Sequence, residues 1–459
     1  MENTLNKRYG LTMAIAMVVG IVIGSGVFFK AEKILNCTGR DLTIGILSWI
    51  IGGLIMVVCA YTFATMATKY EKVNGVVDYA EVMLGKRYGY YLGWFMATIY
   101  FPSMTSVLVW VSSRYFCVLM GWDITGGSCM VIAGFLLVAS YVMNTLSPVL
   151  AGKFQVSTTV IKMIPLLLMA VVGTAKGMSS GLLIQNFTEV AVPASELGGK
   201  GYILFTAVCA TSFAYEGWII ATSINSELKD AKKNLPRALV IGTLIIIVTY
   251  VLYYIGLAGA VENSVMMEGG ETGAKIAFAN VFSSVGASLL FVFIVISCLG
   301  TLNGLMLGTV RGLYAISVRG EGIRPDVMRQ VDPVVNMPVN SAAMGALLTA
   351  VWLLYYYGAN LTDGWFGPFC FDSSEIPIIT IYACYIPIFL MVMKKETGWN
   401  KFKRFVMPVL SVCGCVFIVI AAFFAHRMSA VFYLIVFAAI MFIAFAAEKK
   451  NRQKVAANE

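Results

Sequence analysis

Residues 20–29 read GIVIGSGVFF and lie inside an apolar run that spans residues 11–35. Glycine weakens a helix by about 1 kcal/mol relative to alanine, so Gly24–Gly26 favours unwinding in the middle of a membrane helix. In lipid, unwound backbone persists only where it lines a cavity, and its free N–H groups can then bind an anion. Gly20 and Gly24 also have the GxxxG spacing of closely packed helices. The spacing alone leaves both interpretations open.

The composition indicates an integral membrane protein. Of 459 residues, 59% are hydrophobic and only 12% are charged, whereas soluble domains carry about 25% charged residues. Several apolar runs exceed the roughly 20 residues that a membrane helix needs, and their continuity argues against a β-barrel. The first run is too long for a signal peptide and is predicted to span the membrane. The net charge of +9 is interpreted as basic cytoplasmic loops, not as nucleic-acid binding.

The apolar runs predict an all-α protein whose residues 1–459 form a single membrane domain. We expect twelve spanning helices, at 11–35, 43–68, 88–121, 129–147, 154–175, 201–225, 237–261, 281–318, 338–357, 374–393, 405–425 and 428–447. Interrupted helices at corresponding positions of two halves are the best sequence indicator of a transporter site. Helices 1 and 6 meet this criterion. They predict inverted repeats at 11–175 and 201–393, followed by two further helices at 405–447.

The distribution of basic residues predicts the orientation. If both termini are cytoplasmic, 24 of the 33 Lys and Arg residues fall on the inner side and eight on the outer side. Such a bias favours cytoplasmic termini, and we expect a stand-alone multi-pass protein of the cell inner (plasma) membrane. The remaining basic residue, Lys162, lies inside a spanning segment.

Residues 211–218 read TSFAYEGW and place Glu216 deep in the sixth span. A carboxylate at the bilayer centre costs roughly 2.5–3.5 kcal/mol, so we expect the helix to open at Gly217 and Glu216 to face a polar cavity. Other classes of protein are poorly supported. The chain lacks paired catalytic carboxylates, repeated filter loops and a GxxxxGK[ST] motif. With ten unpatterned cysteines and His426 as the single histidine, we expect no catalytic residue, metal or cofactor.

Three motifs occur in an order that resembles a known family. They are GIVIGSGVFF, FAYEGW followed by NSELKDAKKNLPRAL, and CLGTLNGLMLGTVRGLYAISVRGEGIRP. Together they resemble the amino acid–polyamine–organocation (APC) superfamily, in its L-type amino-acid transporter (LAT)-like branch; the likeness is weak in helices 9–12. The resemblance implies a LeuT-type 5+5 inverted repeat with discontinuous helices 1 and 6. It also implies amino-acid transport by alternating access, commonly as exchange.

The resemblance also implies roles for individual residues. The backbone at Gly24, Ser25 and Gly26 would bind the substrate carboxylate, and Phe213 would be an aromatic lid and gate. The α-ammonium would meet carbonyl groups of the two breaks, and the full substrate-binding set is Val22, Ile23, Gly24, Ser25, Gly26, Phe213, Ala214, Tyr215, Glu216 and Gly217. Lys162 would occupy the place of a coupling sodium ion. The alternative for Lys162 is that its ammonium reaches the membrane interface.

Three roles for Glu216 remain open. It could pair with a cationic substrate side chain or amine, carry a proton, or hold the broken helices by pairing with Lys162 or a backbone N–H. The predicted function is therefore a sodium-independent amino-acid exchanger that accepts cationic amino acids through Glu216. The alternative is a proton-coupled amino-acid or polyamine symporter or antiporter.

Three further features concern gates and partners. The loop KYEKVNGVVDYAEVMLG after helix 2 departs from the family pattern, although Gly75 and Tyr79 persist. Asp372 and Glu375 before helix 10 are interpreted as a solvated outer loop. Animal relatives tether a glycoprotein subunit through a cysteine after helix 3. Neither Cys117 nor Cys129 is clearly placed for this, so we expect no heavy-chain partner beyond the substrates and the lipid bilayer.

Overall fold

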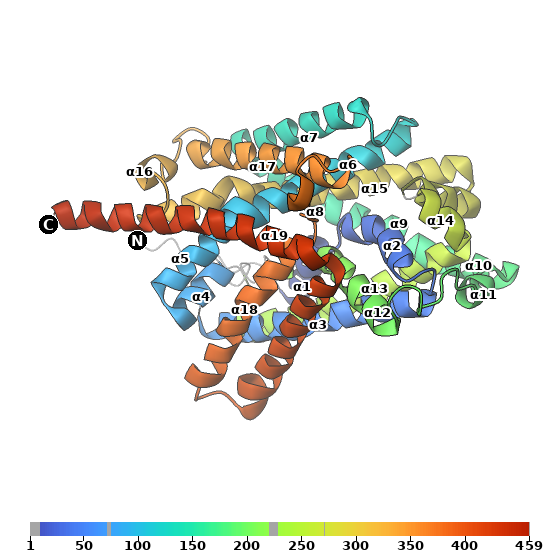
Figure 1. The fold of residues 1–459 in the computed structure, drawn as a ribbon, viewed down its shortest axis with the longest axis horizontal. Coiled ribbons are helices and arrows are strands. Elements are labelled where there is room, and N and C mark those ends of the chain that lie inside the picture. The colour runs from blue at the N-terminus through green and yellow to red at the C-terminus, as the bar shows by residue number, and fades with distance from the viewer. Residues whose placement is uncertain (1–9, 71–74, 220–227, 270, 459) are drawn as a thin grey trace.

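The computed structural model of the chain describes residues 10–70, 75–219, 228–269 and 271–458, and helices dominate these segments. Among the described residues, nine helices are long and apolar enough to cross a membrane. Figure 1 shows α7, α17 and the C-terminal part of α19 running along the long axis, with α4, α5 and α16 toward one end and α10, α11 and α14 toward the other. The predicted all-α membrane protein is confirmed.

The helices of the first half include the break predicted in the first span. They are α1 (Leu11–Val22), α2 (Gly26–Cys37), α3 (Leu42–Lys69), α4 (Val76–Leu84), α5 (Lys86–Phe95), the π-helix η1 (Met96–Tyr100), α6 (Phe101–Met120), α7 (Gly127–Leu146), α8 (Pro148–Ile161), α9 (Met163–Leu168), the π-helix η2 (Met169–Gly173), α10 (Thr174–Ser180) and α11 (Leu182–Thr188). The interruption predicted at Gly24–Gly26 is confirmed, because α1 ends at Val22 and α2 begins at Gly26.

The second half begins with a helix that ends early. Its elements are α12 (Lys200–Ala214), α13 (Ala231–Ala260), α14 (Asn263–Gly269), α15 (Glu271–Ser317), α16 (Pro325–Met328), α17 (Val339–Asn360), the 3-10 turn η4 (Gly367–Phe369), α18 (Ile376–Lys395), the π-helix η5 (Phe402–Val406) and α19 (Met407–Asn458). Non-helical backbone at Ser283 and Arg427 divides α15 and α19 into two helices each. The break at Arg427 agrees with the predicted boundary between the last two spans. The end of the sixth span, residues 220–225, lies outside the described residues.

Several helix ends differ from the predicted boundaries for local reasons. The fifth span begins at Pro148 and not at 154, because proline is well accommodated in the first turn of a helix, where its missing N–H is not needed. The last helix continues to Asn458 and not 447, and an i,i+4 pair between Glu448 and Arg452 lies within this extension. The loop after helix 2 contains α4, where Asp78 and Glu81 pair with Arg319.

A proline explains the π-helical turn in the third span. Pro102 has no N–H, so it cannot donate a hydrogen bond to the carbonyl oxygen of Thr98, four residues earlier. That oxygen instead accepts a hydrogen bond of 3.0 Å from the Trp352 indole N–H of α17. The π-helix η1 lies at this point and carries Tyr100. π-Helical turns are frequent at functional sites, and Tyr100 is part of the site described below.

Glycines allow α13 to lie directly against the fifth span. A Cβ atom on Gly173 of η2 would lie 2.5 Å from the carbonyl oxygen of Gly256 in α13, and one on Gly256 would overlap the carbonyl oxygen of Met169. One turn further along, Gly177 and Gly259 approach each other in the same way. Close approach of small residues is a main source of helix association in lipid, where apolar burial provides no driving force.

This contact predicts the effect of added methyl groups. Gly256→Ala should destabilise the protein by about 1–3 kcal/mol, because the backbone of η2 cannot move away without disturbing the rest of its span. Thermal unfolding of the purified protein in detergent measures the change. Gly134→Ala in α7 is the matched control, since nothing lies within 4 Å of a Cβ at that position. Equal unfolding temperatures for the two variants would contradict the packing role.

Candidate functional site

The two helix breaks meet at one cavity. It has a volume of about 200 Å³, and its walls come from the break in helix 1, the end of α12, and residues of α6 and α15: Val22, Gly24, Ser25, Gly26, Phe213, Glu216, Gly217, Met104, Leu108, Thr301, Gly304, Leu305 and Leu307. Seven of the ten predicted substrate-binding residues line it. Ile23, Ala214 and Tyr215 are not among the residues that line it.

The glycines at the first break permit close approach of other segments. A Cβ on Gly26 would lie 2.5 Å from the Cα atom of Ala214, and one on Gly24 would overlap the side chain of Thr301. The Ser25 hydroxyl is fully buried and has no hydrogen-bond partner among the described residues. The first N–H groups of α2 also lie here and have no carbonyl partner within the helix. The start of α2 is therefore suited to bind an anion.

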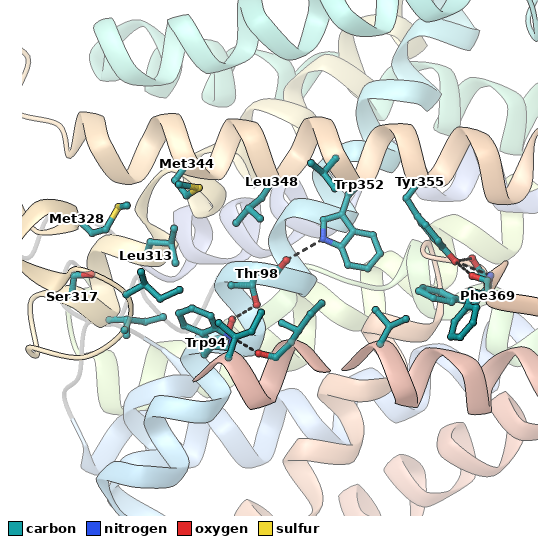
Figure 2. A pocket seen from close by; sticks show the side chains of 18 of the residues that line it. Trp94, Thr98, Leu313, Ser317, Met328, Met344, Leu348, Trp352, Tyr355 and Phe369 are labelled. Atoms are coloured by element: carbon teal, nitrogen blue, oxygen red, sulfur yellow. Dashed lines mark hydrogen bonds between the residues drawn. The ribbon is translucent and has the colours of Figure 1, made fainter. Parts of the chain in front are cut away.

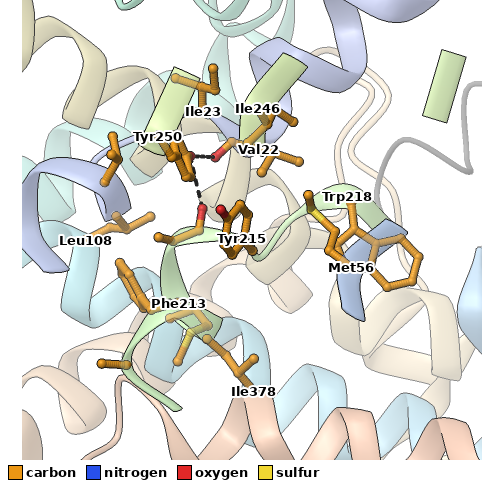
Figure 3. Packing of buried hydrophobic residues seen from close by; sticks show 14 of the residues in the cluster. Val22, Ile23, Met56, Leu108, Phe213, Tyr215, Trp218, Ile246, Tyr250 and Ile378 are labelled. Atoms are coloured by element: carbon orange, nitrogen blue, oxygen red, sulfur yellow. Dashed lines mark hydrogen bonds between the residues drawn. The ribbon is translucent and has the colours of Figure 1, made fainter. Parts of the chain in front are cut away.

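Tyr250 of α13 joins the two breaks from behind. Its hydroxyl oxygen lies 3.3 Å from the carbonyl oxygen of Val22 and 3.0 Å from that of Ala214, as the dashed lines in Figure 3 show. Tyr215 turns away from the cavity, and its hydroxyl donates to the carbonyl oxygen of Trp49 at 2.8 Å. Trp49 in turn makes an edge contact with the Tyr250 ring. An aromatic cluster therefore holds the two unwound segments against each other.

Glu216 faces the cavity with one oxygen atom unpaired. Its Oε1 accepts a hydrogen bond from the hydroxyl of Tyr100, which the π-helix η1 presents. Its Oε2 is buried and has no partner with good hydrogen-bond geometry among the described residues, although the backbone N–H of Gly217 lies beside the carboxylate. A buried carboxylate oxygen that lacks a partner is costly. The arrangement is suited to a group that brings a hydrogen-bond donor or a positive charge into the cavity.

Lys162 lies beside the helix 1 break and not at the membrane interface. It interrupts the fifth span between α8 and α9, and its side chain is buried. The Nζ atom donates to the carbonyl oxygens of Gly20 at 2.5 Å and Ile23 at 2.6 Å. The ammonium thus donates hydrogen bonds to carbonyl groups that the end of α1 leaves without helical partners. The described contacts of Glu216 do not include Lys162, so this part of the structural interpretation of Glu216 is not supported.

Asp372 and Glu375 do not form a solvated loop, and this interpretation was wrong. Only 2% of the Glu375 side chain is exposed, and its Oε1 pairs with Lys30 at 2.7 Å and with Lys33 at 2.5 Å. Asp372 pairs with Lys33 at 2.6 Å. Burial on its own raises the pKa of the Asp372 carboxyl, but Lys33 and Lys30 together bring it down to about 2, so it is charged. Lys30 on α2 is fully buried and requires a partner, which this loop supplies, whereas 37% of the Lys33 side chain is exposed.

This charged cluster lies directly outside the proposed lid. The Lys30 ammonium sits 5.3 Å from the centre of the Phe213 ring, and Phe29 meets the same ring edge-on at 5.8 Å. Phe213 lines the cavity with its other side. The ring therefore separates the cavity from the charges formed by α2 and the start of α18.

One group of metal-ligating side chains occurs among the described residues, next to this cluster. Cys209, Glu375 and His426 have their ligand atoms within 4.8 Å of one another. The two lysines on Oε1 of Glu375 already balance its charge, so the contacts are explained as hydrogen bonds: His426 lies 3.2 Å from Oε2 and the Cys209 sulfur lies 3.7 Å from it. Sequence spacing did not reveal this group, because its members come from α12, α18 and α19.

Comparison with known proteins identifies the family. The sequence model of the family described as "Amino acid permease" matches residues 9–445. The chain belongs to this family. It is 28% identical to the serine/threonine exchanger SteT of Bacillus subtilis over 93% of this chain and 94% of SteT. It is 26% identical to the human large neutral amino acids transporter small subunit 2, and 21% identical to the human cystine/glutamate transporter, each over 76% of this chain and 64% and 68% of the relative.

Membership of this family makes the chain an amino-acid transporter and not an enzyme, as predicted. The roles of the individual residues remain predictions. Sequence reasoning missed Tyr100 and Tyr250 in the permease site. Tyr100 had a usable signal, since Pro102 predicts a helix irregularity nearby, whereas Tyr250 lies in a regular apolar helix without any such mark.

The contacts of Lys162 predict the result of its removal. Lys162→Ala leaves two buried carbonyl groups of the broken helix without their donor, so we expect transport in proteoliposomes to fall at least about tenfold, equivalent to about 1.4 kcal/mol. Lys153→Ala, an exposed lysine in the same span, should transport normally. Full activity of Lys162→Ala would show that the ammonium is dispensable at the break.

The charged cluster around Glu375 predicts a loss of stability. Glu375→Gln leaves the buried Lys30 without its carboxylate, which should cost about 3–5 kcal/mol and lower the thermal unfolding temperature in detergent. Asp326→Asn breaks a pair between exposed side chains with Arg329 and should change stability by less than about 1 kcal/mol. A combined Lys30→Met and Glu375→Leu variant should recover much of the loss. If the combined variant is no more stable than Glu375→Gln, the unpaired charge is not the cause.

Proposed function

We propose that this amino acid permease is a sodium-independent exchanger of amino acids that recognises part of its substrate through Glu216. The single observation that carries the proposal is the cavity between two interrupted helices, where the start of α2 and the unpartnered Oε2 of Glu216 face the same space. The likeness to the exchanger SteT over nearly its whole length supports exchange as the mode of transport.

The walls of the cavity suggest how a substrate docks. Its carboxylate would accept hydrogen bonds from the backbone at Gly24–Gly26, where the helix start favours negative charge. Its α-ammonium would meet carbonyl groups near the end of α12. The carbonyls of Val22 and Ala214 share the single hydroxyl proton of Tyr250, and a carbonyl oxygen has two lone pairs, so each can take a further donor. Glu216 then remains for a donor or cation on the substrate side chain.

The cavity has room for an amino acid. Its volume of about 200 Å³ is many times the roughly 15 Å³ that one water molecule needs. We therefore expect the polar groups on the walls, and not the volume, to select the substrate.

The arrangement of the breaks supports a LeuT-type fold. We infer twelve spans in which 11–175 and 201–393 form the two inverted repeats, because the interrupted helices open the two halves and pack against each other. The ammonium of Lys162 takes the place of a sodium ion at the carbonyls of the first break. A single positive charge there removes the need for a coupling cation.

The cavities also support a mechanism of alternating access. A second cavity of about 310 Å³ shares Gly304 and Leu307 with the first and extends to Arg319 and Glu321. On the opposite side, Phe213 and the Lys30 cluster close the path. With both termini in the cytoplasm, this state is closed outward and leads inward. Cys117 and Cys129 are both buried, which supports a transporter without a disulfide-linked heavy chain.

A second function rests on the same carboxylate. Because Oε2 is buried without a partner, the cavity also suits a protonated Glu216, which would make the protein a proton-coupled transporter of amino acids or polyamines. The two functions differ in what crosses the membrane with the substrate.

A counterflow assay separates the two functions. Proteoliposomes are preloaded with one amino acid and offered labelled serine, threonine, lysine, arginine or their decarboxylation-product amines, with pH and sodium varied. The exchanger should require an internal substrate and should not depend on sodium, since the ammonium of Lys162 occupies the sodium position at the first break. Uptake into empty vesicles that is driven by a proton gradient would favour the proton-coupled function, and uptake that needs sodium would overturn the role of Lys162.

Glu216→Gln tests the side-chain role directly. The amide keeps the size and the contact with Tyr100 but removes the negative charge. Uptake of substrates with a side-chain cation should fall at least about tenfold while uptake of neutral substrates persists, because only the former lose a charge-assisted hydrogen bond. Tyr100→Phe serves as a control for the position of the carboxylate. Equal losses for both classes of substrate in Glu216→Gln would remove Glu216 from side-chain recognition.

A further inference from the structure

An apolar slot lies away from the substrate cavity, between α17, the end of α15 and the last part of α19. Its volume is about 530 Å³, and α5 and η1 form its floor. In Figure 2 its walls run from Met328, Ser317 and Leu313 at one end, past Leu348, to Tyr355 and Phe369 at the other. Val351 and Ile443 on its rim are about half exposed, so the slot opens toward the surroundings of the protein.

The length of the slot matches one leaflet of a bilayer. Its residues on α17 extend from Met344 to Tyr355, which is eleven residues or about 16 Å along a helix. The hydrocarbon core of a bilayer is about 30 Å thick. An extended acyl chain of one leaflet therefore fits the slot from end to end.

The walls of the slot offer nothing for a polar ligand to bind. Its two tryptophans direct their indole N–H groups to backbone oxygens: Trp94 donates to Ile440 at 3.1 Å and Trp352 to Thr98 at 3.0 Å. Their rings face the slot as apolar surface. A chain of methylene groups suits such a space, and a hydrated solute does not.

One end of the slot opens into a basic cavity. This second cavity of about 660 Å³ shares Gly322, Ile323 and Ile443 with the slot, and Arg324 and Lys450 line it. Within the described part of the chain, neither basic side chain has an ion-pair partner. The one acidic residue in its lining, Asp326, is paired with Arg329 outside the lining. The mouth therefore carries two positive charges that no described acidic side chain pairs with.

We propose that an anionic phospholipid binds here, with one acyl chain in the slot and its phosphate between Arg324 and Lys450. The apolar slot alone would accept the chain of any lipid. The two unpaired cations at its end add a preference for a negatively charged headgroup, as basic pockets between membrane helices do. With the predicted orientation, Arg324 and Lys450 are cytoplasmic, so the lipid belongs to the inner leaflet.

The bound lipid would lie next to a part of the transport machinery. The slot includes Thr98, whose carbonyl oxygen is held by Trp352. Two residues later in the same π-helical turn, Tyr100 donates to Glu216. An acyl chain packed on Trp94, Thr98 and Trp352 would therefore restrain the turn that positions Glu216. The lipid site itself does not depend on the proposed substrate.

The first experiment measures binding of phosphatidylglycerol and phosphatidylcholine with identical acyl chains. The full-length protein is purified in a neutral detergent, and bound lipid is counted by native mass spectrometry during a titration. The wild type should prefer phosphatidylglycerol, and Arg324→Gln with Lys450→Gln should weaken its binding at least about tenfold, with phosphatidylcholine unaffected. Lys394→Gln with Lys449→Gln removes two exposed cytoplasmic lysines that line neither cavity and should leave binding unchanged.

A second variant tests the slot separately from the charges. Leu348→Trp fills the slot and should weaken both lipids, while gel filtration and an unchanged unfolding temperature in lipid-free detergent show that the variant is folded. Equal phosphatidylglycerol binding by the wild type and the Arg324 and Lys450 variant would overturn the proposal. So would equally strong binding of sn-glycerol 3-phosphate, which would indicate a free anion site, or conversion of a dimer to a monomer by Leu348→Trp, which would show that a second copy covers the slot.

Discussion

Unwound backbone inside a membrane must find hydrogen-bond partners, and in this permease two side chains from other spans supply them. Lys162 donates to the carbonyl oxygens of Gly20 and Ile23, and Tyr250 bridges those of Val22 and Ala214. Each unsatisfied group would cost several kcal/mol in lipid. These contacts satisfy carbonyl groups at the ends of α1 and α12. The start of α2 lies at the cavity, where we propose that a substrate carboxylate binds.

The same constraint explains the position of the charged residues. Glu216 can lie deep in the sixth span because the helix has already ended at Ala214 and Tyr100 meets one of its oxygens. Beyond Phe213, Lys30 is fully buried one helical turn after the break, and Glu375 at the start of α18 compensates it. Glu216, Lys162 and Glu375 thus lie where a span is interrupted or where a helix begins. Phe213 separates the two charged regions, so a movement of this ring would connect the cavity with the cluster around Glu375.

Sequence reasoning predicted features that are encoded locally. The break at Gly24–Gly26 and the buried Lys162 can be recognised from short segments. Glycine in a helix and lysine in a membrane span each have an unfavourable free energy that points to a special local structure. The family assignment also followed from motifs that lie in order along the chain. The partners of these features could not be predicted, since Tyr250 and Tyr100 lie in apolar helices whose periodicity does not distinguish one inward face from another. Asp372 and Glu375 were misplaced for the same reason: only the packing of α2 against the start of α18 shows that two lysines pair with them.

The prolines suggest how such missing partners can be found. Pro102 releases the carbonyl oxygen of Thr98, which Trp352 then occupies, and the resulting π-helical turn presents Tyr100 to Glu216. Pro165 lies three residues after Lys162 and similarly leaves a helical turn without a donor where α8 gives way to α9. In both spans a proline follows the side chain in question, by two residues after Tyr100 and by three after Lys162. A proline in the middle of a membrane span thus marks backbone that must be satisfied by another helix, and the side chains beside it are the first to test for a role at the site.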